Sequence, residues 1–131
     1  MKNEFLFVYG TLRKFNNNDM HKLLNCNSDY IGEAYYKGKL YRVDDYPALI
    51  PSKDPRDIVI GEVYRLKNID VIKEIDRYEE YGEEFPTPNE FIRKKDFVTM
   101  KDKRKRECFI YFYNRKVDGL FQIKSGDFLA G

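Results

Sequence analysis

The sequence predicts an α+β fold in which a mixed, mostly antiparallel sheet closes into a small β-barrel. Segments with the aromatic and β-branched residues of strands stand before and after one clear helical pattern, an order typical of α+β proteins. The 131 residues include 11 tyrosines and 10 phenylalanines, whose side chains suit half-buried pleated surfaces. Short strands in this number close readily into a barrel. The length suits one domain, residues 1–131, with a core of its own.

The first strand is expected at Phe5–Tyr9, a continuous apolar run that Gly10 ends. Such a run is typical of a strand that is buried on both faces and therefore central in its sheet. The sequence next predicts a short helix at Asp19–Leu24. Two short strands are expected within Tyr30–Val43, where glycines interrupt an aromatic and β-branched pattern.

The second half of the chain begins with an expected loop at Asp44–Asp57, which contains three prolines and no periodic pattern. Within it, Tyr46–Ile50 is unusually apolar for a surface loop. Asn68 is a plausible N-cap for a helix that runs to about Tyr81, after which glycine and proline residues prevent its continuation. The remaining strands are expected at Val59–Leu66, Phe91–Met100, Glu107–Tyr113 and Gly119–Ile123, and the second and third of these are expected to pair.

Composition argues against several classes of function. Charged residues make up 35% of the chain but nearly cancel to a formal charge of +2, so neither nucleic acid nor a membrane is an expected partner. The apolar run Phe5–Tyr9 is too short for a signal peptide or a membrane span, which favours a cytoplasmic protein. A monomer or weak homodimer is expected. Cys26 and Cys108 have no disulfide or metal-site spacing and are expected to be reduced. His21 is the only histidine, which argues against a multi-histidine metal site or a histidine-dependent triad.

Glu79 is the acidic residue that the helical pattern singles out. On a helical wheel it lies within the apolar stripe, whereas Glu74, Asp76 and Glu80 lie about 90° or more from the centre of that stripe. A buried carboxylate is costly unless it is paired or protonated, and its pKa rises toward the range of a general base near neutral pH. Alternatively, Glu79 turns into solvent as the helix end frays. The stripe consists of Ile69, Val71, Ile72, Ile75 and Tyr78.

The segment Tyr9–Arg13 is a strand end followed by a glycine turn. Consecutive backbone N–H groups in such a turn can form an anion-binding concavity, and Gly10 would let a ligand approach the main chain. An ordinary strand-ending turn explains the same residues. Two other clusters have two interpretations each. Tyr111–Tyr113 could line a pocket, but packing in the core explains it equally well. Lys101–Arg106 could bind phosphates, but the neighbouring acids Asp102 and Glu107 favour a solvated hairpin tip.

The segment Phe7–Arg13 resembles the opening signature of the γ-glutamylcyclotransferase-like proteins, which include γ-glutamylamine cyclotransferases and the AIG2-like group. Later segments resemble the same family in the same order, and the likeness spans nearly the whole chain. These segments are Tyr46-Pro47-Ala48, Gly61-Glu62-Val63-Tyr64, Ile75-Asp76-Arg77-Tyr78-Glu79, Phe91-Ile92-Arg93 and Ser125-Gly126-Asp127-Phe128.

The resemblance implies a compact barrel with flanking helices, a central cavity and a small-molecule γ-glutamyl substrate. It also implies that the substrate's α-amine attacks its own γ-carbonyl, giving 5-oxoproline and a free amine without a metal or cofactor. The family's catalytic glutamate falls on Glu79, which would act as general acid and base. Backbone amides around Gly10, Thr11 and Leu12 would hold the α-carboxylate or the developing oxyanion. Further candidates for the pocket wall are Tyr9, Arg93 and Tyr111.

Three positions depart from the family's usual pattern. Glu80 follows the catalytic glutamate where glycine is usual, Phe91 stands where tyrosine is common, and the loop at Phe15–Asn18 lacks glycine. These differences bear on the substrate more than on the fold. A non-catalytic small-molecule-binding module on the same fold is therefore the alternative function, and a nucleic-acid-binding barrel that uses Lys101–Arg106 is a third hypothesis.

Overall fold

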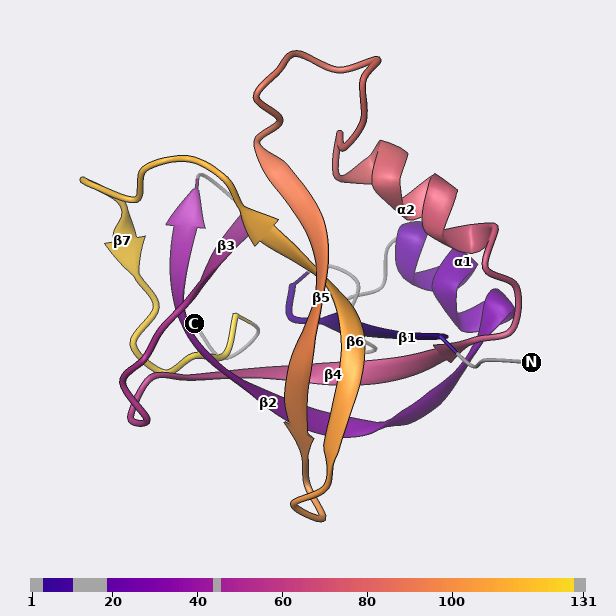
Figure 1. The fold of residues 1–131 in the computed structure, drawn as a ribbon, viewed down its shortest axis with the longest axis horizontal. Coiled ribbons are helices and arrows are strands. Elements are labelled where there is room, and N and C mark those ends of the chain that lie inside the picture. The colour runs from indigo at the N-terminus through magenta and orange to yellow at the C-terminus, as the bar shows by residue number, and fades with distance from the viewer. Residues whose placement is uncertain (1–3, 11–18, 44–45, 129–131) are drawn as a thin grey trace.

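The computed structural model describes residues 4–10, 19–43 and 46–128, and five of its strands close into a mixed barrel (Figure 1). The strands pair in the order β2-β4-β1-β6-β5, and β5 pairs again with β2. Only β1 and β6 are parallel in this ring. The predicted α+β barrel is thereby confirmed. The five strands are β1 (Glu4–Val8), β2 (Ser28–Val43), β4 (Ile58–Leu66), β5 (Phe91–Met100) and β6 (Lys105–Tyr113).

Strand β1 is central, as its continuous apolar run predicted. It lies between β4 and β6, and Leu6, Phe7 and Val8 are all buried. Because successive side chains of a strand point to opposite faces, β1 contributes to two cores. Phe7 packs in the barrel interior, whereas Leu6 and Val8 pack in a second core that includes residues of both helices.

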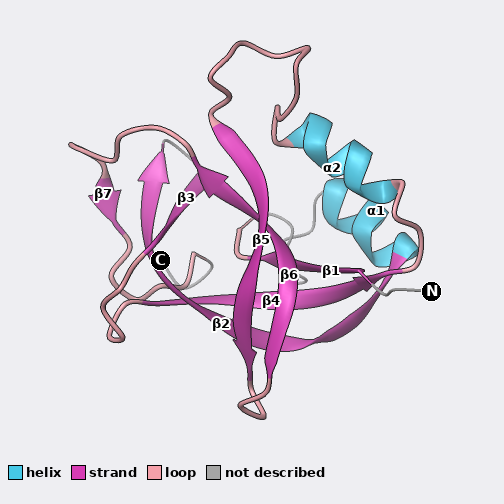
Figure 2. Ribbon diagram, in the orientation of Figure 1, coloured by secondary structure: helices cyan, strands magenta, loops and turns pink. Residues whose placement is uncertain are grey.

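The two helices, α1 (Asp19–Asn27) and α2 (Val71–Tyr78), lie side by side on one side of the barrel (Figure 2). Helix α1 confirms the predicted helix at Asp19–Leu24 and extends it by three residues. Both helices cover the outer face of β1: α1 through Leu24, and α2 through its buried stripe of Val71, Ile72 and Ile75. Neither helix in the described part of the chain has the length and apolarity that a membrane span requires.

The predicted ends of the second helix are wrong. Asn68 caps a turn ahead of the helix, because its Oδ1 accepts the N–H of Asp70 at 3.0 Å and the helix begins only at Val71. At the other end the helix stops at Tyr78. The predicted apolar stripe is too wide for this shorter helix, since Ile69 and Tyr78 are 48% and 42% exposed.

The predictions between residues 30 and 57 need two corrections. Tyr30–Val43 belongs to one continuous strand, β2, which has a bulge near Gly32. Gly38 does not end this strand; it makes room for the adjacent strand. A Cβ on Gly38 would lie 2.5 Å from the carbonyl oxygen of Ile50. That neighbour belongs to β3 (Tyr46–Pro51), a strand that pairs with β2 where a loop was expected. Its prolines are tolerated because β3 is an edge strand.

The C-terminal part follows the prediction closely. Strands β5 and β6 pair over nine positions as a hairpin, and its tip at residues 101–105 is exposed. The last predicted strand is the two-residue β7 (Phe121–Gln122), which pairs with β2. Cys26 and Cys108 are both free thiols.

Candidate active site

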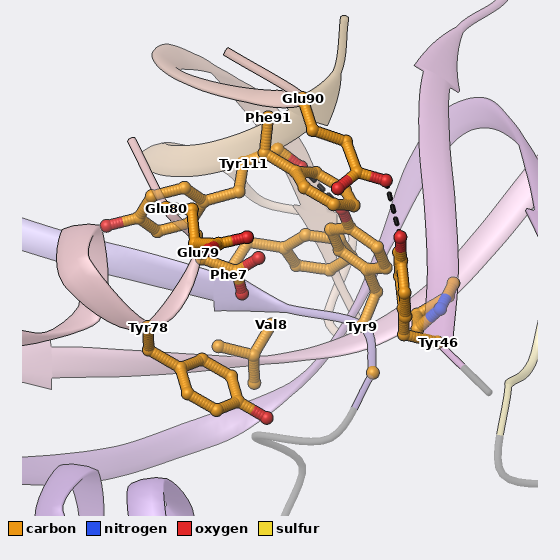
Figure 3. Close-up of a pocket in the computed structure, with 12 residues that line it drawn as sticks. Phe7, Val8, Tyr9, Tyr46, Tyr78, Glu79, Glu80, Glu90, Phe91 and Tyr111 are labelled. Atoms are coloured by element: carbon orange, nitrogen blue, oxygen red, sulfur yellow. Dashed lines mark hydrogen bonds between the residues drawn. The ribbon is translucent and has the colours of Figure 1, made fainter. Parts of the chain in front are cut away.

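A cavity of about 310 Å³ opens where the end of β1, the start of β3, the end of α2 and the start of β5 meet (Figure 3). This volume is at the lower end of the range for small-molecule sites, roughly 300–1,000 Å³. Aromatic rings and carboxylates dominate the described lining, which consists of Phe7, Val8, Tyr9, Gly10, Tyr46, Pro47, Tyr78, Glu79, Glu80, Glu90, Phe91 and Tyr111.

Glu79 reaches the cavity from the residue that immediately follows α2. Its N–H donates to the carbonyl of Ile75 at 2.9 Å, so it keeps the helical phase of the buried face for one more position. The chain then turns away: the N–H of Glu80 donates to Arg77 O and that of Tyr81 to Asp76 O. These two bonds form a Schellman motif, in which Glu80 has the left-handed φ of 55° that favours glycine.

The environment of Glu79 suits proton transfer near neutral pH. Its side chain is half-buried in the cavity, and Figure 3 shows Glu79 amid the lining residues, with Tyr78 to one side and Glu90 beyond. Burial, and then repulsion by the carboxylate of Glu90, raise the pKa of Glu79 from 4.5 to about 7. A group with this pKa can both accept and return a proton at neutral pH.

Tyr9 and Gly10 form the part of the wall that β1 supplies. The buried hydroxyl of Tyr9 donates to the carbonyl of Tyr111, and burial together with the charge of Glu79 raises the pKa of Tyr9 well above its ordinary value. Tyr9 is therefore a neutral phenol. A Cβ on Gly10 would lie 2.6 Å from Cγ of Pro47, so glycine here lets β3 approach the end of β1. Thr11 and Leu12, the other two positions of the predicted amide cluster, lie outside the described residues.

Tyr111 lines the cavity, whereas Arg93 does not. The hydroxyl of Tyr111 donates to Oδ1 of Asp76 at 2.5 Å, and Nε of Arg93 lies 3.0 Å from the same oxygen. The Arg93 guanidinium also lies over the rings of Tyr81 and Phe109. Asp76 was predicted to point away from the core, but its side chain is only 16% exposed because long side chains of β5 and β6 reach it. This network ties α2 to the barrel beside Glu79.

Glu90 is a lining residue that sequence reasoning missed. It precedes β5 and is half-buried, and its Oε2 accepts the hydroxyl of Tyr46 at 2.5 Å. The Tyr46 ring packs against Phe91, with 5.9 Å between ring centroids. Glu90 lies in no periodic element, so the sequence contained no phase from which its direction could be inferred. Its place just before a strand was the one available signal.

The described lining carries three carboxylates, those of Glu79, Glu80 and Glu90, and neither lysine nor arginine. Such a surface attracts ammonium groups and repels additional carboxylates. Within residues 4–10, 19–43 and 46–128, histidine, cysteine and acidic side chains form no group of three that could hold a metal ion.

Comparison with known proteins agrees with this architecture. The family profile described as "Gamma-glutamyl cyclotransferase, AIG2-like" matches residues 6–130. The gamma-glutamylcyclotransferase family protein YtfP of Escherichia coli strain K12 is 32% identical over 126 residues, which cover 95% of each chain. The crystal structure of YkqA from Bacillus subtilis matches with a TM-score of 0.72 and 30% identity, over 96% of this chain and 39% of YkqA. An AIG2-like protein of Mus musculus shares the fold, with a TM-score of 0.68 and 20% identity over 90% of this chain and 82% of the mouse chain. The chain belongs to the AIG2-like γ-glutamyl cyclotransferase family.

Proposed function

We propose that the protein converts a γ-glutamyl amine or γ-glutamyl amino acid to 5-oxoproline and a free amine, with Glu79 as general acid and base. The observation that carries the proposal is the carboxylate of Glu79 in an aromatic cavity, with its pKa at about 7. Membership of the family supports the class of reaction.

Glu79 would act at two steps of one intramolecular transfer. The substrate's α-ammonium is not a nucleophile, so the carboxylate first takes one of its protons. The free amine attacks the γ-carbonyl carbon, a C–N bond forms, and the carbonyl oxygen becomes an oxyanion. After the attack the ring nitrogen bears two hydrogens and a positive charge, and it gives one of these protons to solvent. When the oxyanion collapses, the original C–N bond breaks and Glu79 gives the proton that it took to the departing nitrogen. Atoms and charge balance, and the carboxylate is regenerated.

The cavity wall would contribute by holding the substrate in a folded conformation. Ring closure is unimolecular, so bringing the amine close to the γ-carbonyl supplies much of the reduction in barrier. The rings of Phe7, Tyr9 and Phe91 offer apolar surfaces for the glutamyl methylene groups. We assign to the backbone at Gly10, which lines the same cavity as Glu79, the binding of the α-carboxylate or of the oxyanion.

The direct test is release of 5-oxoproline from a panel of γ-glutamyl dipeptides and γ-glutamyl alkylamides, followed by chromatography. We expect Glu79→Gln to lower kcat by roughly 10²- to 10⁴-fold, because glutamine cannot accept a proton. Glu83→Gln is the matched control, since Glu83 is an exposed acid outside the cavity lining. Equal activity of Glu79→Gln and the wild type would refute the mechanism. Binding of the amides without any product would instead favour the binding module.

A further inference from the structure

Glu90 has a place in the cavity that the proposed reaction leaves unused. We propose that Glu90, oriented by Tyr46, binds a cationic group on the departing amine, so that preferred substrates are γ-glutamyl amides of amines with a second positive charge. Diamines are the simplest members of this class. The inference rests on the proposed function, because it names the substrate class of that same site.

The backbone around Glu90 is held by specific hydrogen bonds. The N–H of Asn114, just after β6, donates to the carbonyl of Glu90 at 2.7 Å. Asn89 closes the preceding segment, since its Oδ1 accepts the N–H of Gly82 at 3.0 Å and its Nδ2 donates to the Gly82 carbonyl at 3.1 Å. Residues on both sides of the loop therefore fix where the Glu90 side chain begins. A carboxylate positioned in this way is suited to recognition.

The side chain of Glu90 is oriented as well as placed. The hydroxyl of Tyr46 donates to Oε2 at 2.5 Å, while the Tyr46 ring rests on Phe91. An ionised carboxylate accepts roughly four hydrogen bonds, so one phenol leaves it with the capacity to bind N–H donors of a ligand. A half-buried carboxylate with an alkylammonium partner forms a charge-assisted hydrogen bond, which is stronger than a neutral one.

Glu79 and Glu90 enter the same cavity from different elements, so one ligand could contact both. Figure 3 shows Glu79 beside Glu80, and Glu90 joined to Tyr46 by a hydrogen bond, on different sides of the lining. With the α-amine at Glu79, the substituent on the departing nitrogen would extend from the γ-carbonyl into the rest of the cavity, whose lining includes Glu90 and Tyr46. The two carboxylates are close enough for Glu90 to raise the pKa of Glu79.

The charge of the lining adds discrimination against the opposite kind of substrate. A departing amine that bears its own carboxylate would enter a cavity with three carboxylates from Glu79, Glu80 and Glu90. Like charges at close range are unfavourable, so such a substrate binds more weakly than a neutral one. Arg93, the arginine of β5, is paired with Asp76 and lies outside the lining.

The experiment compares three γ-glutamyl amides of similar length with a cationic, a neutral and an anionic end. They are the mono-amide of 1,4-diaminobutane, the amide of pentylamine and the amide of 4-aminobutanoate. For each we would measure kcat/KM from 5-oxoproline release and Kd by calorimetry. We expect the wild type to prefer the cationic amide to the neutral one by roughly tenfold, and the neutral to the anionic.

The variants assign this preference to a residue. Glu90→Gln is expected to bring the ratio of kcat/KM for the cationic amide to that for the neutral amide close to one. Tyr46→Phe removes the hydroxyl that orients Glu90 but keeps the ring on Phe91, and it is expected to lower the same ratio. Tyr46→Phe also provides the test if Glu90→Gln fails to fold. Glu83→Gln removes one negative charge outside the lining, and we expect it to preserve the wild-type ratio.

Two outcomes would overturn the inference: similar values for the three amides in the wild type, or an unchanged ratio in Glu90→Gln. An equal loss with all three amides is a case of the second outcome, because Glu90 would then act on the shared glutamyl part. Failure of the proposed function is a different result, namely no 5-oxoproline from any amide. In that case the ratio of Kd values for the cationic and neutral amides still decides the role of Glu90.

Discussion

The raised pKa of Glu79 predicts that its carboxylate lowers the stability of the protein at neutral and alkaline pH. The pKa is about 7 in the folded protein and 4.5 in its ordinary, solvated state. Between these two values the folded protein binds more protons than the unfolded chain, so the free energy of unfolding falls as pH rises. The stabilisation is present below about pH 4.5 and is lost as pH rises through about 7.

The size of the effect follows from the difference in pKa. The difference is about 2.5 units (7 minus 4.5), and each unit corresponds to about 1.36 kcal/mol, which gives an upper value of about 3 kcal/mol. Because Glu79 is only half-buried, solvent screening reduces this to roughly 1–2 kcal/mol. Glu79→Gln should therefore resemble the wild type near pH 5, where Glu79 is protonated, and be more stable by roughly 1–2 kcal/mol near pH 8.5.

Urea denaturation of the wild type and Glu79→Gln at these two pH values measures the prediction, because the midpoint and slope give each free energy of unfolding. Titrations elsewhere in the chain are common to both proteins and cancel in the difference. Glu83→Gln, an exposed acid outside the cavity, should show the same difference from the wild type at both pH values. A stability difference for Glu79→Gln that does not change with pH would refute the reasoning.

Three further predictions concern the cavity and the residues that support it. The kcat/KM for a γ-glutamyl amide should rise with pH through about 7, where Glu79 loses its proton. Glu90→Gln should move the midpoint of this pH profile to lower pH, because it removes a repulsive charge. An unshifted midpoint would contradict this origin of the raised pKa. Asp76→Ala should lower the free energy of unfolding by roughly 2–4 kcal/mol in urea denaturation, because it removes the acceptor of the Tyr111 hydroxyl and the ionic partner of the partly buried Arg93. A loss below about 0.5 kcal/mol would show that these contacts of Asp76 are not stabilising. Glu80→Gly should raise the free energy of unfolding by about 1 kcal/mol, since the residue has a φ of 55°, and Glu80→Ala serves as the control that removes the charge but keeps the Cβ.

The features that could be predicted from the sequence depend on patterns within a few residues. The apolar run at Phe5–Tyr9 contains enough information to make β1 central, because both of its faces must be covered. The direction of Glu79 follows from its distance of four residues from Ile75, and this phase survives although the helix ends one residue earlier. The lone acid in the apolar stripe was therefore found without any tertiary information.

The features that could not be predicted depend on residues far apart in the chain. Strand β3 contains two prolines that match a loop, and its strand conformation depends on pairing with β2 and on space beside Gly38. Asp76 is drawn toward the barrel by Tyr111, which lies 35 positions further along. A helical wheel contains the direction of each Cα–Cβ bond but not the partners that reach it from other elements.

The parallel pairing of β1 with β6 makes the cavity a joint product of the two ends of the chain. Leu6 is in register with Phe109, and the hydrogen bond from Tyr9 to Tyr111 joins residues 102 positions apart. Contacts of such long sequence separation form late and slow the folding of β-rich proteins. A chain still emerging from the ribosome therefore lacks one wall of the pocket until β6 has been synthesised. Binding of a γ-glutamyl ligand would consequently report on completion of the whole barrel. A fragment that ends before residue 105 lacks β6 and should not bind the ligand.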